Sequence, residues 1–204
     1  MSPGAEWNHN IHYHPAVLAA VPAGAARALD VGCGDGRLAR ELRAVVPRVT
    51  ALDRDEPTLA AAWAADGGLG IDYVLGDFLS QDFEAGSFDF VGCIATLHHM
   101  EAGDGLRRMA DLLRPGGRLA VVGLARLGGI RGIGDLPAEI GGFLLHRLKR
   151  SRHQFVRVTA PTLWPPPETY GSMRRIARAT LPGADFRRRL LWRYTLVWEK
   201  PAAS

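Results

Sequence analysis

A chain of 204 residues with 47% hydrophobic content has the size and composition of one α/β domain with a sizeable core. Its longest apolar runs, such as residues 119–124, are far shorter than the ~18 residues of a membrane-spanning helix, and no basic region followed by an apolar block opens the sequence, so we expect a cytoplasmic protein. Cys33 and Cys93 are the only cysteines and neither belongs to a C-x-x-C pair, which argues against a disulfide framework or a thiolate zinc site.

The net charge of +4 conceals two halves of opposite sign. Residues 1–104 carry 6 Lys and Arg against 15 Asp and Glu, whereas residues 105–204 carry 19 against 6. A basic half can attract nucleic acid, anionic lipid or an acidic small molecule. Because 23 of the 25 basic residues are Arg, a solvated surface in an arginine-rich protein is the simpler interpretation.

The first conspicuous segment is WNHNIHYH at residues 7–14, which contains His9, His12 and His14. A metal site would need three or four converging ligands with supporting partners, and no carboxylate or cysteine accompanies these imidazoles. We therefore predict no metal site here. The continuation HPAVLAAVP indicates a short helix that leads to the first strand.

From residue 27 onward, short apolar runs alternate with helix-like segments. Continuous runs rich in Val, Leu and Ile are typical of strands buried on both faces. Regular alternation of strand and helix predicts a doubly wound, mostly parallel α/β sheet with helices on both faces, and the aromatic, β-branched C-terminus is expected to add an antiparallel edge strand. The predicted strands are 27–33, 48–53, 71–77, 88–94 and 117–124, and the predicted helices are 37–45, 56–65 and 105–113.

The densest chemical signal is LDVGCGDGRLARELR at residues 29–43, where Gly32, Gly34 and Gly36 form G-x-G-x-G before a helix begins. Glycines let the chain turn sharply and let a ligand approach the backbone, and a helix N-terminus presents unpaired N–H groups. The dinucleotide fingerprint G-x-G-x-x-G would place its third glycine at Arg37, so the spacing argues against NAD.

Carboxylates end three successive predicted strands, at Asp30, Asp53 and Asp77. Asp53 lies 17 residues beyond Gly36, where its carboxylate can accept hydrogen bonds from both ribose hydroxyls. The Asp77 carboxylate can accept a hydrogen bond from an adenine amino group, while the ring of Phe78 packs against the base. A single acid at a strand end is usually a helix cap or a solvated loop residue, but three in succession favour a nucleoside site.

With FDFVGCIATLHHM (88–100) and LLRPGGRLAVVGL (112–124), these motifs resemble the S-adenosylmethionine-dependent methyltransferases of class I, the seven-stranded, Rossmann-like class. The likeness covers about residues 27–124. It implies S-adenosylmethionine as the cofactor and S-adenosylhomocysteine as its product.

The resemblance also implies which residues hold each part of the cofactor. The glycine loop would line the methionine part, Asp53 would hold the ribose, and Asp77 with Phe78 would contact the adenine. The residues expected to contact the cofactor are Tyr13, Asp30, Gly32, Cys33, Gly34, Gly36, Asp53, Arg54, Asp77, Phe78 and Ile94.

The acceptor is expected at the carboxyl ends of the strands where the strand order reverses, between the first and fourth predicted strands. The segment ATLHHM leaves the fourth strand there, so Leu97, His98 and His99 should face the transferable methyl group. Methyl transfer from a sulfonium is an in-line displacement that alignment accelerates strongly. His98 or His99 is the candidate general base. The alternative is that one imidazole positions the loop and the other faces solvent.

Two segments outside the shared core are expected to complete the pocket. In the resembled class the segment before the first strand often folds over the cofactor, so we expect Tyr13 and His14 over its methionine end and His9 and His12 near the acceptor mouth. A long insertion after the fifth strand indicates a lid with a basic amphipathic helix within 136–152. The alternative is that this helix lies on a membrane surface or recognises an acidic partner. Trp164 is a candidate to pack against an aromatic acceptor, and the alternative is that it belongs to the core.

We therefore predict one methyltransferase domain, which consists of an N-terminal cover (1–24), a cofactor-binding core (25–124), a lid-like insertion (125–166) and a C-terminal helix and strand pair (167–204). The pattern specifies neither the acceptor nor the oligomeric state. LHHM resembles enzymes that methylate small metabolites, and no Asn-Pro-Pro-Tyr-like segment of the kind used on bases and amides is present. The alternatives are an RNA-modifying enzyme that uses its basic half and a cofactor-binding protein without turnover.

Overall fold

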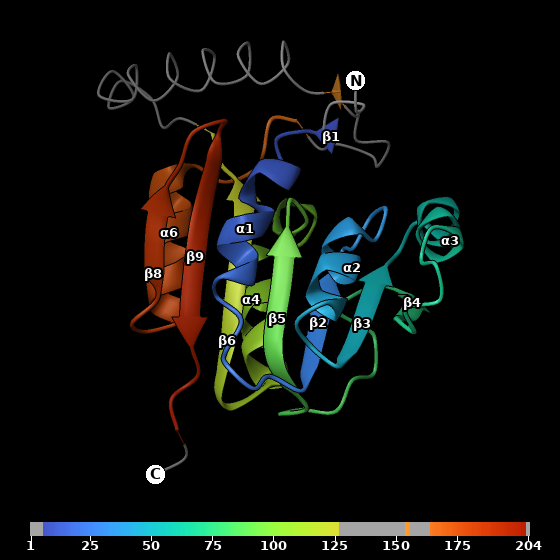
Figure 1. The fold of residues 1–204 in the computed structure, drawn as a ribbon. Helices are drawn as coiled ribbons and strands as arrows, with labels where there is room; N and C mark the ends of the chain where they lie inside the picture. Colours follow the sequence, from blue (N-terminus) through green and yellow to red (C-terminus); the bar gives the residue numbers. More distant parts are fainter. Residues whose placement is uncertain (1–5, 127–153, 156–163, 203–204) are drawn as a thin grey trace.

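The computed structural model describes residues 6–126, 154–155 and 164–202 of the chain. Within these ranges strands and helices alternate, as Figure 1 shows. The strands are β1 (Glu6–Trp7), β2 (Arg27–Val31), β3 (Arg48–Asp53), β4 (Asp72–Leu75), β5 (Phe88–Ile94), β6 (Leu113–Leu124), β7 (Gln154–Phe155), β8 (Asp185–Arg188) and β9 (Arg193–Glu199). The helices are α1 (His14–Leu18), α2 (Arg37–Arg43), α3 (Glu56–Ala64), α4 (Ala102–Leu112) and α6 (Tyr170–Thr180), with short 3-10 helices η1 (Ile11–Tyr13) and η2 (Leu97–His99).

Seven strands form one sheet in the order β4-β3-β2-β5-β6-β9-β8. The first five are parallel to one another, whereas β9 is antiparallel to β6 and β8 is antiparallel to β9. The chain builds outward from β2 to β4 and then returns to β5 on the other side of β2, so the strand order reverses between β2 and β5. The predicted fold class, a mostly parallel, doubly wound, Rossmann-like sheet with an antiparallel C-terminal edge, is confirmed.

Helices cover both faces of the sheet. Figure 1 shows α1 and α2 in front of the strands, with α4 and α6 behind them. Neighbouring residues of a strand point to opposite faces: Leu29 and Val31 of β2 pack into the core beside α4 and α6, whereas Ala28 packs into the core beside α1 and α2. Burial on both faces explains why these strands are continuous apolar runs in the sequence.

Side-chain caps set where the helices begin. Thr169 and Ser172 form a reciprocal capping box at the start of α6. Glu101 accepts a hydrogen bond from the backbone N–H of Asp104 at 2.5 Å and so caps α4. This helix consequently begins at Ala102, three residues before the start that its apolar pattern predicts.

The C-terminal aromatic stretch forms a hairpin of two antiparallel strands, as the strand pair expected at this end of the chain requires. β8 and β9 flank a turn at residues 189–192, where Leu191 and Trp192 have positive φ angles of 60° and 56°. β9 then runs beside β6 with Arg193 opposite Leu124. This register brings the first residue of β9 to the carboxyl end of β6, at the same edge of the sheet as the glycine loop.

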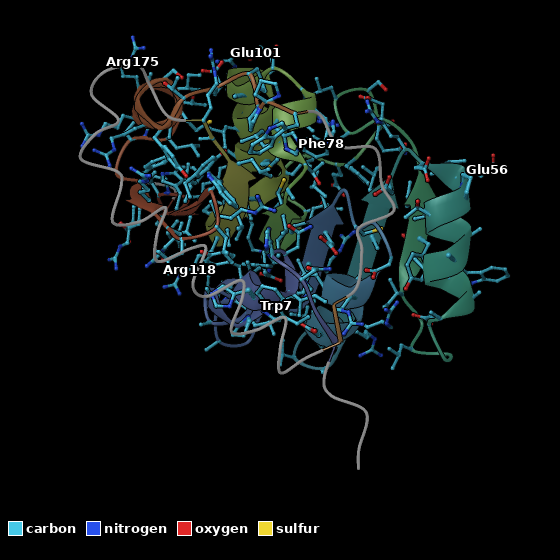
Figure 2. All side chains as sticks on the ribbon, turned by 90° about the horizontal axis from the view of Figure 1, so that it is seen from above. Trp7, Glu56, Phe78, Glu101, Arg118 and Arg175 are labelled. Carbon is cyan, nitrogen blue, oxygen red and sulfur yellow. The ribbon has the colours of Figure 1, made fainter. Side chains whose placement is uncertain are left out.

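The N-terminal segment lies over the carboxyl ends of the strands. Figure 2 looks down on this edge and labels Trp7 on the α1 side of the strand ends and Phe78 on the opposite side, which agrees with their membership of different cores. The Tyr13 hydroxyl donates a hydrogen bond to the carbonyl oxygen of Leu190 at 2.7 Å. This bond ties the N-terminal segment to the C-terminal hairpin.

Among the described residues, no helix has the length and hydropathy needed to cross a membrane. The basic helix expected within residues 136–152 lies outside the described ranges. The lid assigned to residues 125–166 therefore stays a prediction.

Candidate active site

A cavity of about 400 Å³ opens at the carboxyl ends of β2, β3, β4 and β5. It lies where the strand order reverses, the place where doubly wound sheets bind ligands. Many of the residues singled out in the sequence share its wall. Those that line it are His14, Asp30, Gly32, Cys33, Gly34, Asp53, Arg54, Asp77, Phe78, Ile94, His98 and His99.

Asp30 is the penultimate residue of β2 and is almost completely buried, with 1% of its surface exposed. Its Oδ2 atom has no hydrogen-bond partner. Burial raises the pKa of Asp30 to about 8, and the negative charges of Asp53 and Asp35 act in the same direction. Burial therefore favours the protonated carboxyl group, and a positively charged ligand beside it would favour the ionised form.

The glycine loop is shaped by hydrogen bonds to β3 and by close packing. The backbone N–H groups of Gly32 and Cys33 both donate to the carbonyl oxygen of Leu52, at 2.8 and 2.9 Å. Gly32 has a φ angle of 70°, and a Cβ atom there would overlap the side chain of Thr96. Gly34 also has a positive φ angle, but a Cβ atom there would meet nothing within 4 Å. The backbone at Gly34 is thus open to the cavity.

Gly36, the last glycine of the motif, has a different task. It starts α2 in a left-handed conformation with a φ angle of 72°. A Cβ atom at this position would lie 3.0 Å from the Cβ atom of Ala62 and 3.1 Å from the Tyr73 hydroxyl. Gly36 does not line the cavity, and its glycine identity is explained by the turn and by packing against α3 and β4.

Asp53, at the end of β3, is held between two backbone groups. One carboxylate oxygen accepts the N–H of Gly34 at 2.8 Å, and the other accepts the N–H of Asp55 at 3.0 Å. Each oxygen retains a second lone pair. The carboxylate is thus oriented by the loop and still able to accept hydrogen bonds from a ligand in the cavity.

Asp77 and Phe78 follow β4 at the far end of the cavity from β6. The Asp77 carboxylate accepts the backbone N–H of Leu79 at 2.9 Å, which stabilises the turn after the strand. Phe78 is buried in the core on the α4 side and is also one of the residues that line the cavity. An apolar ring beside an exposed carboxylate provides the two surfaces that a flat base requires.

His98 and His99 lie in η2 directly after β5, with ring centroids 4.1 Å apart. His98 is buried, and neither of its ring nitrogens has a hydrogen-bond partner. Burial, together with the positive charges of His99 and Arg193, lowers the pKa of His98 to about 4. Burial also lowers the pKa of His99, and the positive charge of Arg54 lowers it as well, whereas the negative charge of Asp53 acts to raise it. Both imidazoles are therefore neutral at pH 7.

Other predicted residues lie outside the cavity wall. Leu97 is buried in the core on the α4 side, and Trp164 is 62% exposed. His9 makes an edge contact with Trp7, with centroids 5.6 Å apart, and His12 makes one with Tyr13, with centroids 4.8 Å apart. These contacts leave His14 as the histidine of the N-terminal segment that lines the cavity.

Tyr13 and His14 have well-defined partners. Burial raises the pKa of Tyr13 to about 12, the charges of Arg193 and Arg189 acting against it, and its hydroxyl bonds to Leu190 as described above. His14 Nδ1 donates to Glu41 Oε2 at 2.9 Å, which joins the N-terminal segment to α2. No group of three or more His, Cys, Asp and Glu side chains in the described ranges converges as a metal site.

The structure adds wall residues that the sequence patterns did not single out, above all Asn10 and Arg193. Arg193 is 7% exposed, and its Nη2 donates to Asn10 Oδ1 at 2.8 Å. The N-terminal and C-terminal parts of the chain meet in this bond. Arg193 reaches the cavity through the antiparallel pairing of β9 with β6. It could have been predicted only if the register of these two strands had been known from the sequence.

Comparison with known proteins agrees with this architecture. Residues 29–121 match the sequence family described as "Methyltransferase domain". An uncharacterised methyltransferase of Mycobacterium tuberculosis is 38% identical over 196 residues, which cover 96% of this chain and 98% of that protein.

Two further similarities have narrower coverage. A ubiquinone biosynthesis O-methyltransferase of Xanthomonas axonopodis is 32% identical over 149 residues, which cover 70% of this chain and 61% of that protein. The crystal structure of an S-adenosylmethionine-dependent methyltransferase from Mesorhizobium loti is 31% identical, with a TM-score of 0.50 over 54% of this chain and 53% of that one. Taken with the seven-stranded sheet, these similarities show that the chain belongs to the class I S-adenosylmethionine-dependent methyltransferase family.

Proposed function

We propose that this methyltransferase transfers the methyl group of S-adenosylmethionine to a small-molecule acceptor bound beside η2. The observation that carries the proposal is a single cavity that collects Asp30, Asp53 and Asp77 from three strand ends together with two neutral imidazoles. Its volume of about 400 Å³ is typical of a small-molecule site. The Xanthomonas relative, named as an O-methyltransferase of ubiquinone biosynthesis, supports a small-molecule acceptor.

The residues of the cavity suit this cofactor. The unpartnered, buried Oδ2 of Asp30 is matched to the ammonium group of a methionine moiety. The two oxygens of Asp53 are matched to a ribose diol. The open backbone at Gly34 leaves room for the chain that joins them. Asp77 and Phe78 would then hold the adenine.

When bound, the cofactor supplies an electrophilic methyl group on a positively charged sulfur. The protein's contribution is alignment, because the strand ends hold one reactant and η2 with the N-terminal segment encloses the other. The neutral His98 ring has one N–H donor and one free nitrogen acceptor, so it can accept a hydrogen bond from an acceptor hydroxyl. His99, less buried, is the second candidate base.

The N-terminal wall is assigned to the residues that line the cavity, which include Asn8, Asn10, Ile11 and His14. The Glu41 partner of His14 fixes this wall against α2. An RNA acceptor is not proposed, because two exposed arginines of the C-terminal hairpin already have local protein partners. Arg187 pairs with Asp185 at 2.9 Å, and Arg189 donates to Thr195 at 2.9 Å.

Titration calorimetry with S-adenosylhomocysteine tests the cofactor assignment. We expect saturable binding of one ligand per chain, and protection of the protein against thermal unfolding in proportion to ligand concentration. Adenosine and methionine serve as partial ligands and should each bind more weakly than the complete molecule. An absence of binding at concentrations that saturate other members of the family would contradict the proposal.

A further inference from the structure

Arg193 is a buried cation without an acidic partner in the described part of the chain. It begins β9 opposite Leu124, the last residue of β6, and both residues line the cavity. Its Nη2 donates to a neutral acceptor, Asn10 Oδ1. Its Nε is buried with no hydrogen-bond partner.

The surroundings of this guanidinium do not compensate its charge. Burial lowers the pKa of Arg193 to about 10, and the groups that oppose this effect are the hydroxyls of Tyr13 and Tyr170. The Tyr13 hydroxyl already donates to Leu190. A buried charge is costly unless it is paired, and the described residues leave this site short of one negative charge.

The charges in the cavity are separated between its two ends. Asp30 and Asp53 lie at the ends of β2 and β3, where the cofactor is proposed to bind. Arg193 lies at the end of β6, and its charge acts on His98. Arg37 and Arg54 also line the cavity, but Arg37 is half-buried and Arg54 is exposed to solvent. The buried cation is thus on the His98 side of the cavity, where the acceptor is expected.

We infer that Arg193 binds an anionic oxygen of the methyl acceptor, so that the substrate is a small organic acid carrying a carboxylate or an acidic hydroxyl. Arg193 lines the cavity, and its planar guanidinium keeps N–H groups that are not used in protein hydrogen bonds and can form a charge-assisted hydrogen bond to such an oxygen. Asn10 accepts a hydrogen bond from Nη2 and so restricts the orientation of the guanidinium plane. The inference rests on the proposed function, because it identifies the second ligand of the same cavity.

Three probes of similar shape test this inference by calorimetry, with and without saturating S-adenosylhomocysteine. They are 4-hydroxybenzoate, which carries a carboxylate, 4-nitrophenol above its pKa, which carries a phenolate, and the neutral 4-hydroxybenzamide. We expect at least one anion to bind about tenfold or more tightly than the amide. Preference for the carboxylate or for the phenolate then identifies the anionic group.

The variants Arg193→Met and Arg193→Lys separate recognition from a structural role. Arg193→Met should abolish the preference for the anion while leaving S-adenosylhomocysteine affinity within about twofold, and its thermal midpoint should be equal or higher because an uncompensated buried charge is removed. Arg193→Lys should keep part of the preference. Arg187→Met is the matched control, because it removes one positive charge from the same hairpin at an exposed position.

Equal binding of charged and neutral probes to the wild-type protein, or no binding of any probe, would overturn the inference. A preference for the anion that survives in Arg193→Met would overturn it as well. If S-adenosylhomocysteine binds but the protein shows no preference for the anionic probes, the inference that the acceptor is an organic acid fails and the proposed function stands. If S-adenosylhomocysteine does not bind, the proposed function fails, and the titrations without it still report on Arg193.

Discussion

The carboxylate of Asp53 accepts a hydrogen bond from the backbone N–H of Gly34 at 2.8 Å, which joins the end of β3 to the glycine loop after β2. Its second oxygen accepts the N–H of Asp55 at 3.0 Å. The carboxylate is therefore held in place before any ligand arrives, and pre-organised groups lose less freedom on binding. This arrangement makes Asp53 the most direct probe of the proposed ribose contact.

Asp53→Asn should weaken S-adenosylhomocysteine binding by about tenfold to a hundredfold, because hydrogen bonds to a charged group contribute about 1.5–3 kcal/mol. Asp72→Asn is the matched control, since Asp72 begins β4 at the opposite edge of the sheet and does not line the cavity. Calorimetry on both variants measures the difference. Equal affinity in Asp53→Asn and the wild-type protein would dismiss the ribose role.

Binding of S-adenosylhomocysteine at pH 7 should release a proton from Asp30. Burial, with Asp53 and Asp35, raises the pKa of Asp30 to about 8 in the free protein, and an ammonium group beside it lowers that pKa again. Calorimetry in buffers of different ionisation enthalpy measures the release directly. Asp30→Asn should remove it, and an unchanged proton count in that variant would show that the proton comes from elsewhere.

His98 should make stability depend on pH in a defined window. Its pKa is about 4 in the folded protein against 6.5 when unfolded, so the unfolded chain binds more protons between these values. The free energy of unfolding contributed by His98 therefore falls as pH drops from 6.5 to 4, by up to about 1.4 kcal/mol per pH unit. Urea unfolding at several pH values in this range measures the free energy of unfolding, and its dependence on pH should be weaker in His98→Gln than in the wild-type protein. The same pH dependence in both proteins would refute the burial of a neutral imidazole.

The glycine loop offers a comparison between two alanine variants. Gly32→Ala and Gly34→Ala both place a side chain at positive φ, which costs about 1–2 kcal/mol. Only the Cβ at residue 32 overlaps Thr96, and overpacking adds about 1–3 kcal/mol. Gly32→Ala should therefore unfold at a lower urea concentration, whereas Gly34→Ala should lose mainly ligand affinity. Similar stability of the two variants would contradict the packing of the loop.

The core of the fold was predictable because its information is local. Continuous apolar runs identify β2, β3 and β5 as strands of the sheet, and a carboxylate at or near the end of such a run must lie at the carboxyl edge of the sheet. This is why Asp30, Asp53 and Asp77 were found together in one cavity wall. The start of α4 was less accurate, since a cap at Glu101 outweighs the apolar pattern of the residues after it.

The acceptor side of the cavity was harder to predict because distant parts of the chain build it. Arg193 reaches the site through the register of β9 against β6, which no local pattern encodes. In the N-terminal segment, His9 and His12 were expected at the pocket, but their rings contact Trp7 and Tyr13. Aromatic packing in this segment decides which imidazole faces the cavity, and it favours His14.

Transfer of label from methyl-labelled S-adenosylmethionine to a mixture of small metabolites tests the central claim most directly. Wild-type protein should label one or a few low-mass compounds, and Asp53→Asn should label them at a reduced rate while Asp72→Asn behaves as the wild type. Total RNA incubated in parallel should stay unlabelled. Label found in RNA, or no label in the low-mass fraction despite binding of S-adenosylhomocysteine, would contradict small-molecule methyl transfer.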